Sequence, residues 1–319
     1  MKFLVSGANG FVGKPLCAAI LRQGWQVRGA VRLSAPLPDG VEVVAVGDID
    51  GDTDWTDALS GVEVVIHLAA RVHVMKDTSA DPLAEFLRVN LEGTANLARQ
   101  AARAGVQRLV YASSVKVNGE EATASRPYTE LDEPHPQDPY GISKWQAEQA
   151  LRSIARETGL EIVIVRPPLV YGPGVKGNFI SLLAAIDKGI PLPLAGADNA
   201  RSLVYVGNLA DALIACATHP AAAGQTYLVS DGEDVSTALL VDRIAGVLGC
   251  KNRSFYFPPG LLRIAAGLLG RSAQVDRLFG SLCVNEAKIR HELSWTQPYT
   301  LNQGLQATAD WYRNRKAGR

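Results

Sequence analysis

Three polar side chains in this sequence could act together on a proton: Ser114, Tyr140 and Lys144. Tyr140 and Lys144 are four residues apart in a stretch with helical periodicity, so they share one helix face about one turn apart. Ser114 follows residues 107–112, which have the pattern of a buried strand. A phenol with a pKa near 10 is a poor base, but a lysine ammonium about 4 Å away favours the phenolate by about 4 kcal/mol and brings its pKa towards 7. We therefore predict proton transfer by Tyr140 at a substrate oxygen that Ser114 binds.

A glycine-rich turn at the start of the chain, MKFLVSGANGFVG, indicates where a dinucleotide binds. Residues 2–6 are a predicted buried strand and residues 11–23 a predicted helix, with Gly7, Gly10 and Gly13 at three-residue spacing. The first glycine permits a tight turn, the second lets a pyrophosphate approach the backbone, and the third lets the helix pack on the strand. The N–H groups at the helix start then face the phosphates. A turn that needs glycine only for steric reasons is the alternative.

Strand and helix patterns alternate through the first half of the chain, as a parallel sheet requires. Further strands are predicted at 25–32, 41–46, 62–67, 107–112 and 161–166, with short ones at 203–206 and 226–229 that return to the sheet. Helices are predicted at 81–104, 140–157, 237–248, 259–269, 285–293 and 301–315. The predicted fold class is α/β, a Rossmann-type doubly wound parallel sheet with a smaller, mostly helical C-terminal substrate domain. We expect a dinucleotide-binding domain over 1–167, which 202–229 rejoin, and a substrate-binding domain over 168–201 and 230–319.

Composition excludes several other classes of protein. The chain has 319 residues, is 47% hydrophobic and carries 32 basic and 32 acidic residues, so no basic field indicates nucleic acid or a membrane surface. Its four cysteines are scattered without metal-ligand spacing, which favours free thiols in a reducing compartment and no metal site. The first strand begins directly after Met1, and the apolar stretch 260–270 is interrupted by Arg263 and too short to span a bilayer. We expect a cytoplasmic protein.

Motifs in a fixed order extend this interpretation: GANGFVG, GDI, HLAA, VNLEGT, YASSV, YGISK, RPPLVYGPG and, near the end, KIRHELSW. With them the chain resembles the extended short-chain dehydrogenases/reductases of the nucleotide-sugar epimerase/dehydratase family over nearly its whole length. The resemblance implies that Ser114, Tyr140 and Lys144 form the catalytic triad, that Lys144 also holds the nicotinamide ribose, and that the protein is a homodimer. The cofactor-binding residues that it implies are Gly7, Asn9, Gly10, Phe11, Val12, Gly13, Arg32, Asp48, Ile49, Leu68, Ala69, Ala70, Asn90, Ser113, Tyr140, Lys144 and Pro167.

The end of the second predicted strand departs from the family pattern. Members that use NAD carry an acidic residue there for the ribose hydroxyls. This chain has Val31 instead, followed by Arg32, and Arg28 lies on the same strand. Because no carboxylate is present and an arginine is able to meet a 2′-phosphate, NADP(H) is favoured over NAD(H) as the nicotinamide cofactor, NAD(P)(H). The alternative is that Arg32 stacks on the adenine of either cofactor.

The residues after the catalytic serine bear on the reaction. Similar sugar 4,6-dehydratases carry an acidic pair there, whereas this chain has Val115 and Lys116, so we expect redox at C4 without dehydration. The chain is most similar to the O-antigen reductases that reduce the 4-keto group of a UDP-4-keto-6-deoxy-N-acetylhexosamine with NAD(P)H. The alternative is a UDP-hexose or UDP-N-acetylhexosamine 4-epimerase with bound NAD. Two other classes are a dehydrogenase of steroid or flavonoid-like alcohols and a dinucleotide-binding sensor without turnover.

The predicted substrate contacts are less regular. The resemblance places Arg201 on the diphosphate of a sugar nucleotide, which suits an arginine fork and argues against an apolar ligand. Leu169 stands where many relatives have a diphosphate-binding asparagine, so Asn178 is the substitute candidate, with a helix cap as the alternative. Arg277 is a candidate for a second diphosphate contact. The substrate set predicted for this UDP-sugar is Ser114, Lys116, Tyr140, Asn178, Arg201 and Arg277.

Overall fold

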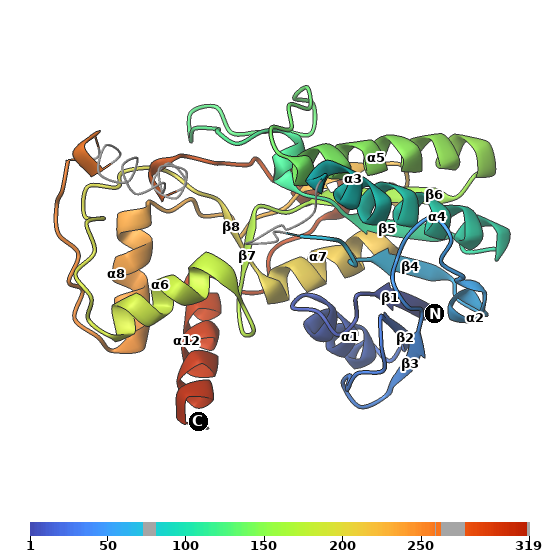
Figure 1. Ribbon diagram of the computed structural model, residues 1–319, viewed down its shortest axis with the longest axis horizontal. Coiled ribbons are helices and arrows are strands. Elements are labelled where there is room, and N and C mark those ends of the chain that lie inside the picture. Colours follow the sequence, from blue (N-terminus) through green and yellow to red (C-terminus); the bar gives the residue numbers. More distant parts are fainter. Residues whose placement is uncertain (73–80, 259, 263–277, 318–319) are drawn as a thin grey trace.

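A seven-stranded parallel sheet forms the centre of the computed structural model, which describes residues 1–72, 81–258, 260–262 and 278–317 (Figure 1). Across the sheet the strands are β3 (Val41–Ala45), β2 (Gln26–Val31), β1 (Lys2–Ser6), β4 (Val64–His67), β5 (Arg108–Ala112), β6 (Glu161–Arg166) and β9 (Thr226–Leu228). The chain order runs in opposite directions on the two sides of β1, so a crevice for a ligand lies at the carboxyl ends of β1 and β4. The predicted α/β fold class is confirmed.

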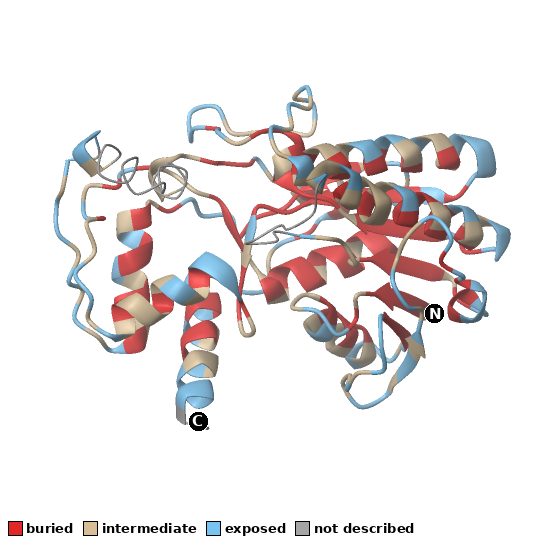
Figure 2. Cartoon of the chain, viewed as in Figure 1, coloured by how far each residue is buried: buried red, intermediate tan, exposed pale blue. Residues whose placement is uncertain are grey.

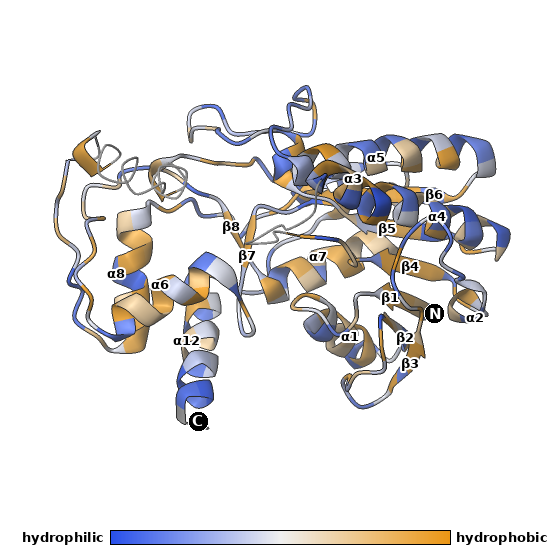
Figure 3. Cartoon of the chain, in the orientation of Figure 1, coloured by the Kyte–Doolittle hydropathy of each residue, from blue (hydrophilic) through white to orange (hydrophobic). Residues whose placement is uncertain are grey.

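Apolar side chains on both faces hold the sheet between two layers of helices. On β1, Phe3 and Val5 belong to the core of one face and Leu4 to the core of the other, as the two-residue period of a strand requires. Figures 2 and 3 show a buried, apolar sheet under helices whose outer surfaces are exposed and hydrophilic. The covering helices are α1 (Gly13–Arg22) and α7 (Val206–Thr218) on the first face, and α2 (Thr56–Leu59), α4 (Gly93–Arg103) and α5 (Pro139–Thr158) on the second.

The segment predicted as one helix over 81–104 contains a π-helical turn. It consists of α3 (Pro82–Leu87), the π-helix η1 (Arg88–Glu92) and α4. Asp81 starts it by accepting a hydrogen bond from the Ala84 amide at 3.1 Å. Asn90 lies within the π turn and is buried, on the side that meets α5. Such turns occur mostly at functional sites, so this irregularity draws attention to Asn90.

The C-terminal half builds a second, mostly helical core. Pro167 and Pro168 end β6, because proline has no N–H to continue a sheet ladder. The elements that follow are β7 (Leu169–Tyr171), α6 (Gly177–Asp187), β8 (Leu203–Tyr205), the 3₁₀-helix η3 (Pro220–Ala222), α8 (Thr237–Leu248), α11 (Ala287–Leu293) and α12 (Leu301–Ala317). Apolar side chains of α6, α8 and α12 pack together away from the sheet (Figure 1). None of the helices that the described residues form is long and apolar enough to cross a membrane.

One sequence prediction about the sheet is wrong. Residues 226–229 return to it as β9 beside β6, but the predicted strand at 203–206 does not: β8 pairs with β7 in a separate two-stranded sheet. Contacts between residues far apart in sequence hold this small sheet. The buried Asp231 accepts hydrogen bonds from the hydroxyl of Tyr171 on β7 and from Nδ2 of Asn208 on α7, both at 2.7 Å. The helix predicted over 259–269 lies outside the described residues except for 260–262. The domain boundaries stay predictions.

We expect Gly13→Ala to destabilise the fold by about 1–3 kcal/mol, because an added Cβ would lie 2.2 Å from the Gly7 carbonyl oxygen. Urea unfolding measures the change in the free energy of unfolding. Gly246→Ala in α8 is the matched control: its Cβ meets nothing within 4 Å, and helix propensity predicts a gain of about 1 kcal/mol. Equal free energies of unfolding for the two variants would contradict the tight packing of the turn.

Candidate active site

The three predicted catalytic residues meet at the carboxyl edge of the sheet. Ser114 follows β5, and Tyr140 and Lys144 lie on the first two turns of α5. Ser114 hydrogen-bonds the Tyr140 phenol. Lys144 is only 2% exposed and donates from Nζ to the carbonyl oxygen of Ala112, the last residue of β5, at 2.7 Å. Strand end and helix start therefore bring a hydroxyl, a phenol and an ammonium group to one place.

The start of α5 is fixed by a group of charged residues. Asp138 caps the helix by accepting a hydrogen bond from the Gly141 amide at 2.7 Å, and Pro139 occupies the first helical position. Lys116, in the 3₁₀-helix η2 (Val115–Val117), donates to Glu120 at 2.8 Å and also to Asp138. The ammonium group predicted to contact substrate is thus held between two carboxylates. Glu120 is four residues from Lys116, whereas Asp138 comes from the start of α5, so only the contact with Asp138 depends on the fold.

Burial changes the acidity of both titrating members of the triad. Desolvation raises the pKa of the Tyr140 phenol above 10, and the hydrogen bond from Ser114 opposes that shift. Desolvation lowers the pKa of Lys144 to about 7, while the carboxylate of Glu148 one turn away raises it. The Lys144 Nζ lies 4.5 Å from the ring centre of Tyr111 and 5.8 Å from that of Tyr140. The predicted lowering of the phenol pKa is wrong for the chain alone, because desolvation outweighs the ammonium.

The glycine turn has the shape that a pyrophosphate requires. Gly7 has a φ of +67°, and a Cβ there would lie 3.1 Å from the Ala69 backbone. The Gly10 amide donates to the Gly7 carbonyl at 2.9 Å, and Gly13 packs against that same carbonyl. The turn leads directly into α1, so the positive end of the helix dipole lies at the turn and favours an anion there. The residues present therefore fit a dinucleotide.

Most of the remaining predicted cofactor residues lie along the same edge. Asn9, Phe11 and Val12 belong to the glycine turn, and the others follow the carboxyl ends of strands: Asp48 and Ile49 after β3, Leu68, Ala69 and Ala70 after β4, Ser113 after β5 and Pro167 after β6. The fold thus gathers residues from five parts of the chain at one edge of the sheet, where ligands bind in open α/β folds.

Asn90 and Ser113 use their side chains inside the protein. Asn90 accepts from the Arg71 amide at 2.8 Å and donates to the Arg71 carbonyl at 3.0 Å and to Ser143 Oγ at 2.9 Å. The Ser143 hydroxyl in turn donates to the Tyr140 carbonyl at 2.8 Å. Ser113 donates to Glu148 at 2.6 Å, in the interior. Asn90 therefore ties the segment after β4 to the helix turn that carries Tyr140.

The two arginines of the second strand have different surroundings. Arg32 is 75% exposed and forms an ion pair with Asp48 at 3.0 Å. Arg28 is buried: its guanidinium donates to three backbone carbonyls at the end of α2 and pairs with Glu42 at 2.7 Å. Arg28 thus caps a helix within the protein, so of the two only Arg32 is exposed.

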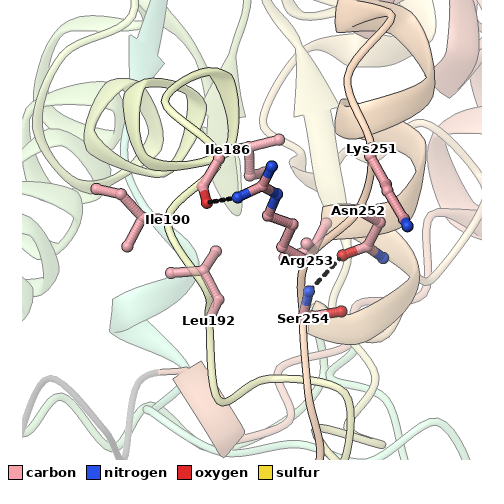
Figure 4. Close-up of a pocket in the computed structure, with 9 residues that line it drawn as sticks. Ile186, Ile190, Leu192, Lys251, Asn252, Arg253 and Ser254 are labelled. Atoms are coloured by element: carbon pink, nitrogen blue, oxygen red, sulfur yellow. Dashed lines mark hydrogen bonds between the residues drawn. The ribbon is translucent and has the colours of Figure 1, made fainter.

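The predicted substrate residues lie on the C-terminal side of the crevice. Arg201 donates from Nη1 to the Gly280 carbonyl at 3.2 Å, and desolvation lowers its pKa. Asn178 is exposed on the second residue of α6, whose N-cap is Lys176, so Asn178 is not the helix cap. Arg277 lies outside the described residues. A separate cavity of about 10 Å³ between α6 and residues 251–254 holds at most one water molecule and touches none of the triad (Figure 4).

His67 is a site residue that sequence reasoning missed. It is fully buried, with Nδ1 2.6 Å from Ser6 Oγ and Nε2 3.0 Å from Thr94 Oγ1. Because the Ser6 oxygen accepts from the amides of Leu68 and Ala69, at 3.0 and 3.1 Å, its own hydrogen goes to Nδ1. The neutral ring then carries its proton on Nε2 and donates to Thr94. This chain of hydrogen bonds connects the glycine turn to the segment after β4.

Comparison with known proteins assigns a family. The model of the NAD dependent epimerase/dehydratase family matches residues 3–230. The chain belongs to that family. It is 43% identical to a UDP-glucose 4-epimerase of Vibrio cholerae over 96% of this chain and 94% of the relative. It is 28% identical to an N-acetyl-alpha-D-glucosaminyl-diphospho-ditrans,octacis-undecaprenol 4-epimerase of Escherichia coli O157:H7, covering 97% and 94%.

Among solved structures, the chain is similar to MoeE5 in complex with UDP-glucuronic acid and NAD. The two share a TM-score of 0.80 and 28% identity over 99% of this chain and all of MoeE5. Family members of this kind are extended short-chain dehydrogenases/reductases, so the predicted family is confirmed. The described residues contain no group of three or more histidines, cysteines and carboxylates placed to hold a metal ion.

We expect the stability of the protein to fall as the pH drops from about 6.5 to about 3, because burial lowers the pKa of His67 to about 3 while the unfolded side chain takes up a proton near 6.5. His67→Gln removes this titration, so its free energy of unfolding declines less steeply, by up to about 1.4 kcal/mol per pH unit. Urea unfolding at pH 7 and pH 4.5 measures the difference. The exposed His291→Gln is the control and keeps the wild-type slope. A wild-type slope in His67→Gln as well would show that His67 is not the titrating group.

Proposed function

We propose that this protein is a nucleotide-sugar 4-epimerase that acts on a UDP-hexose with NAD. The observation that carries the proposal is the position of Ser114, Tyr140 and Lys144 beside a dinucleotide turn, in a chain 43% identical over nearly its whole length to a UDP-glucose 4-epimerase. The sequence indicates two possible reactions at C4: it favours a 4-ketoreductase, and the 4-epimerase is the alternative. Both relatives named above are 4-epimerases, which supports it over the reductase.

Each residue of the triad has its own role at the sugar C4 hydroxyl. Tyr140 takes the proton from O4 and later gives it back, and the Ser114 hydroxyl holds O4 beside the phenol. Lys144 stabilises the phenolate while it is in its ammonium form, which it loses as the pH rises through about 7. The bound nicotinamide supplies a reversible acceptor for the C4 hydride. Because desolvation alone raises the pKa of the phenol, the phenolate that accepts the O4 proton depends on the hydrogen bond from Ser114 and on the Lys144 ammonium.

The surroundings of Arg32 support NAD rather than NADP. Its guanidinium is paired with Asp48, which offers a negative charge where a 2′-phosphate would come, and Arg28 is committed to α2. NAD is also the dinucleotide bound in the MoeE5 complex. A 4-ketoreductase that uses NADPH is the second candidate, and one observation favours it: the Arg32–Asp48 pair is exposed, and such pairs contribute little, so Arg32 is able to turn to a phosphate.

Two measurements on the purified protein test the proposal. The dinucleotide released on denaturation is identified, and UDP-glucose and UDP-galactose are each incubated with the protein and followed by NMR. We expect retained NAD(H) and interconversion of the two sugars without added cofactor. Oxidation of NADPH by a UDP-4-keto sugar, with no interconversion, would establish the reductase instead.

We expect Tyr140→Phe to lower kcat by about 10²–10⁴-fold, because it removes the group that moves the O4 proton. KM for the UDP-sugar and the amount of bound NAD stay close to wild type, since the phenol contributes little to binding. Tyr128→Phe is the control, because Tyr128 lies in the loop before α5 and not at the triad. Unchanged turnover in Tyr140→Phe would show that the triad does not carry the reaction.

We expect Asp48→Asn to improve binding of NADP(H) relative to NAD(H) by about fivefold, because it removes a negative charge and frees Arg32, a change equivalent to ~1 kcal/mol. Titration calorimetry with each dinucleotide measures the ratio of the two Kd values. The exposed Asp39→Asn is the control. A ratio that is the same in both variants would mean that the Arg32–Asp48 pair does not face the ribose.

A further inference from the structure

A buried ion pair lies directly beneath the triad. Arg166, the last residue of β6, donates from Nη2 and Nε to the two carboxylate oxygens of Glu148, at 2.6 and 2.9 Å. The two side chains are 2% and 0% exposed. A bidentate pair of this kind is strong and fixes the direction of both groups. It joins the end of β6 to the middle of α5, which lies against the sheet (Figure 1).

The pair also holds the strand that carries the catalytic serine. The Ser113 hydroxyl donates to Glu148 Oε1 at 2.6 Å, and Ser113 directly precedes Ser114. Arg166 donates from Nη1 to Asn118 Oδ1 at 3.0 Å, just beyond η2. Glu148 thus binds one side chain that follows β5 and one at the end of β6, and its own helix also carries Tyr140 and Lys144.

Glu148 stands one turn after Lys144 on the same helix face. The charged and titratable groups around the two are Tyr111, Tyr140 and His67 on the Lys144 side, and Arg166 and Arg152 on the Glu148 side, with Arg152 at 3.9 Å. His67 is neutral above about pH 3 and so carries no charge beside Lys144. The Glu148 carboxylate is the group whose negative charge opposes the effect of desolvation on the Lys144 ammonium.

Folding stability alone does not account for this arrangement. Apolar residues of the same volume are often as stabilising as a buried ion pair, because two charges must first lose their water. The position of the pair, in contact with the residue before Ser114 and one turn from Lys144, points instead to the site.

We propose that Glu148 and Arg166 are positioning residues for the triad: through Ser113 they hold Ser114 against Tyr140, and the Glu148 carboxylate, one helix turn from Lys144, favours the ammonium form of that side chain. The positioning role rests on the proposed function, because it explains how the residues of the same site keep the geometry and charge that the reaction needs. Glu148 touches no substrate in this role.

The test compares two variants of the holoenzyme that remove one carboxylate each. Glu148→Gln keeps an acceptor for Ser113 but loses the charge. Its matched control is Glu161→Gln, because Glu161 pairs with Arg108 at 2.6 Å across β5 and β6 at the opposite edge of the sheet. We expect Glu148→Gln to lower kcat by about 100-fold with KM little changed, as a small misplacement of reacting groups does. Its kcat also falls with rising pH at a lower pH than in wild type, because Lys144 loses its proton earlier. Glu161→Gln retains wild-type values of both.

Two further variants separate the parts of the proposal. Ser113→Ala cuts the link to Ser114 but leaves the ion pair, so we expect a loss in kcat of about tenfold with no shift of the pH profile. If Glu148→Gln does not fold, the double variant Glu148→Gln/Arg166→Met, which leaves no unpaired charge, takes its place. Its expected shift has the same direction but is smaller, because the positive charge of Arg166 is removed together with the carboxylate.

A measurement without sugar keeps this proposal separate from the proposed function. NMR of protein with ¹³C-labelled lysine, assigned with Lys144→Met, follows the titration of Lys144 directly. We expect a pKa near the wild-type value of about 7 in Glu161→Gln and a lower one in Glu148→Gln. If wild type fails to interconvert the UDP-sugars, the proposed function is overturned while this titration still tests Glu148. A folded Glu148→Gln protein with the Lys144 titration and the kcat of Glu161→Gln overturns the proposal.

Discussion

One buried cation governs the arrangement of this site. The Lys144 ammonium is almost fully shielded from water and has the last carbonyl of β5 and the face of Tyr111 as partners. An ammonium group removed from water is costly unless it is hydrogen-bonded, so α5 and β5 must meet in the one register that provides these partners. That register also sets where Tyr140 and Ser114 lie. The packing of helix on sheet and the alignment of the reacting groups are consequently one constraint.

The same burial acts in opposite directions on the two titrating groups. It lowers the pKa of the lysine and raises that of the phenol, because in each case the uncharged form is favoured. Hydrogen bonds and nearby charges then correct these shifts one by one: Ser114 for the phenol and Glu148 for the ammonium. The chemistry of the site is therefore adjusted by residues around the triad as much as by the triad itself.

The parts of the site that are local in sequence could be predicted, and those made by distant contacts could not. The glycine turn, the spacing of Tyr140 and Lys144, and the strand before Ser114 each depend on a few neighbouring residues. In the sequence alone, Arg28 lies on the strand expected to meet the cofactor, and nothing near it identifies another partner. Its actual partner, the end of α2, comes some thirty residues later. The contact of Lys116 with Asp138, the partner of β8 and the hydrogen bonds of His67 are likewise set only when separate elements pack.

The route of the chain through the fold has a consequence for its synthesis. After β6 the polypeptide leaves the sheet, builds β7, α6 and β8, and only then returns with α7 and β9. Until residue 218 has been made, α7 does not cover its part of the apolar face that includes Phe3 and Val5, and until residue 228 has been made β6 is an open edge. The sheet of the first half is therefore completed only after β7, α6 and β8 have been synthesised.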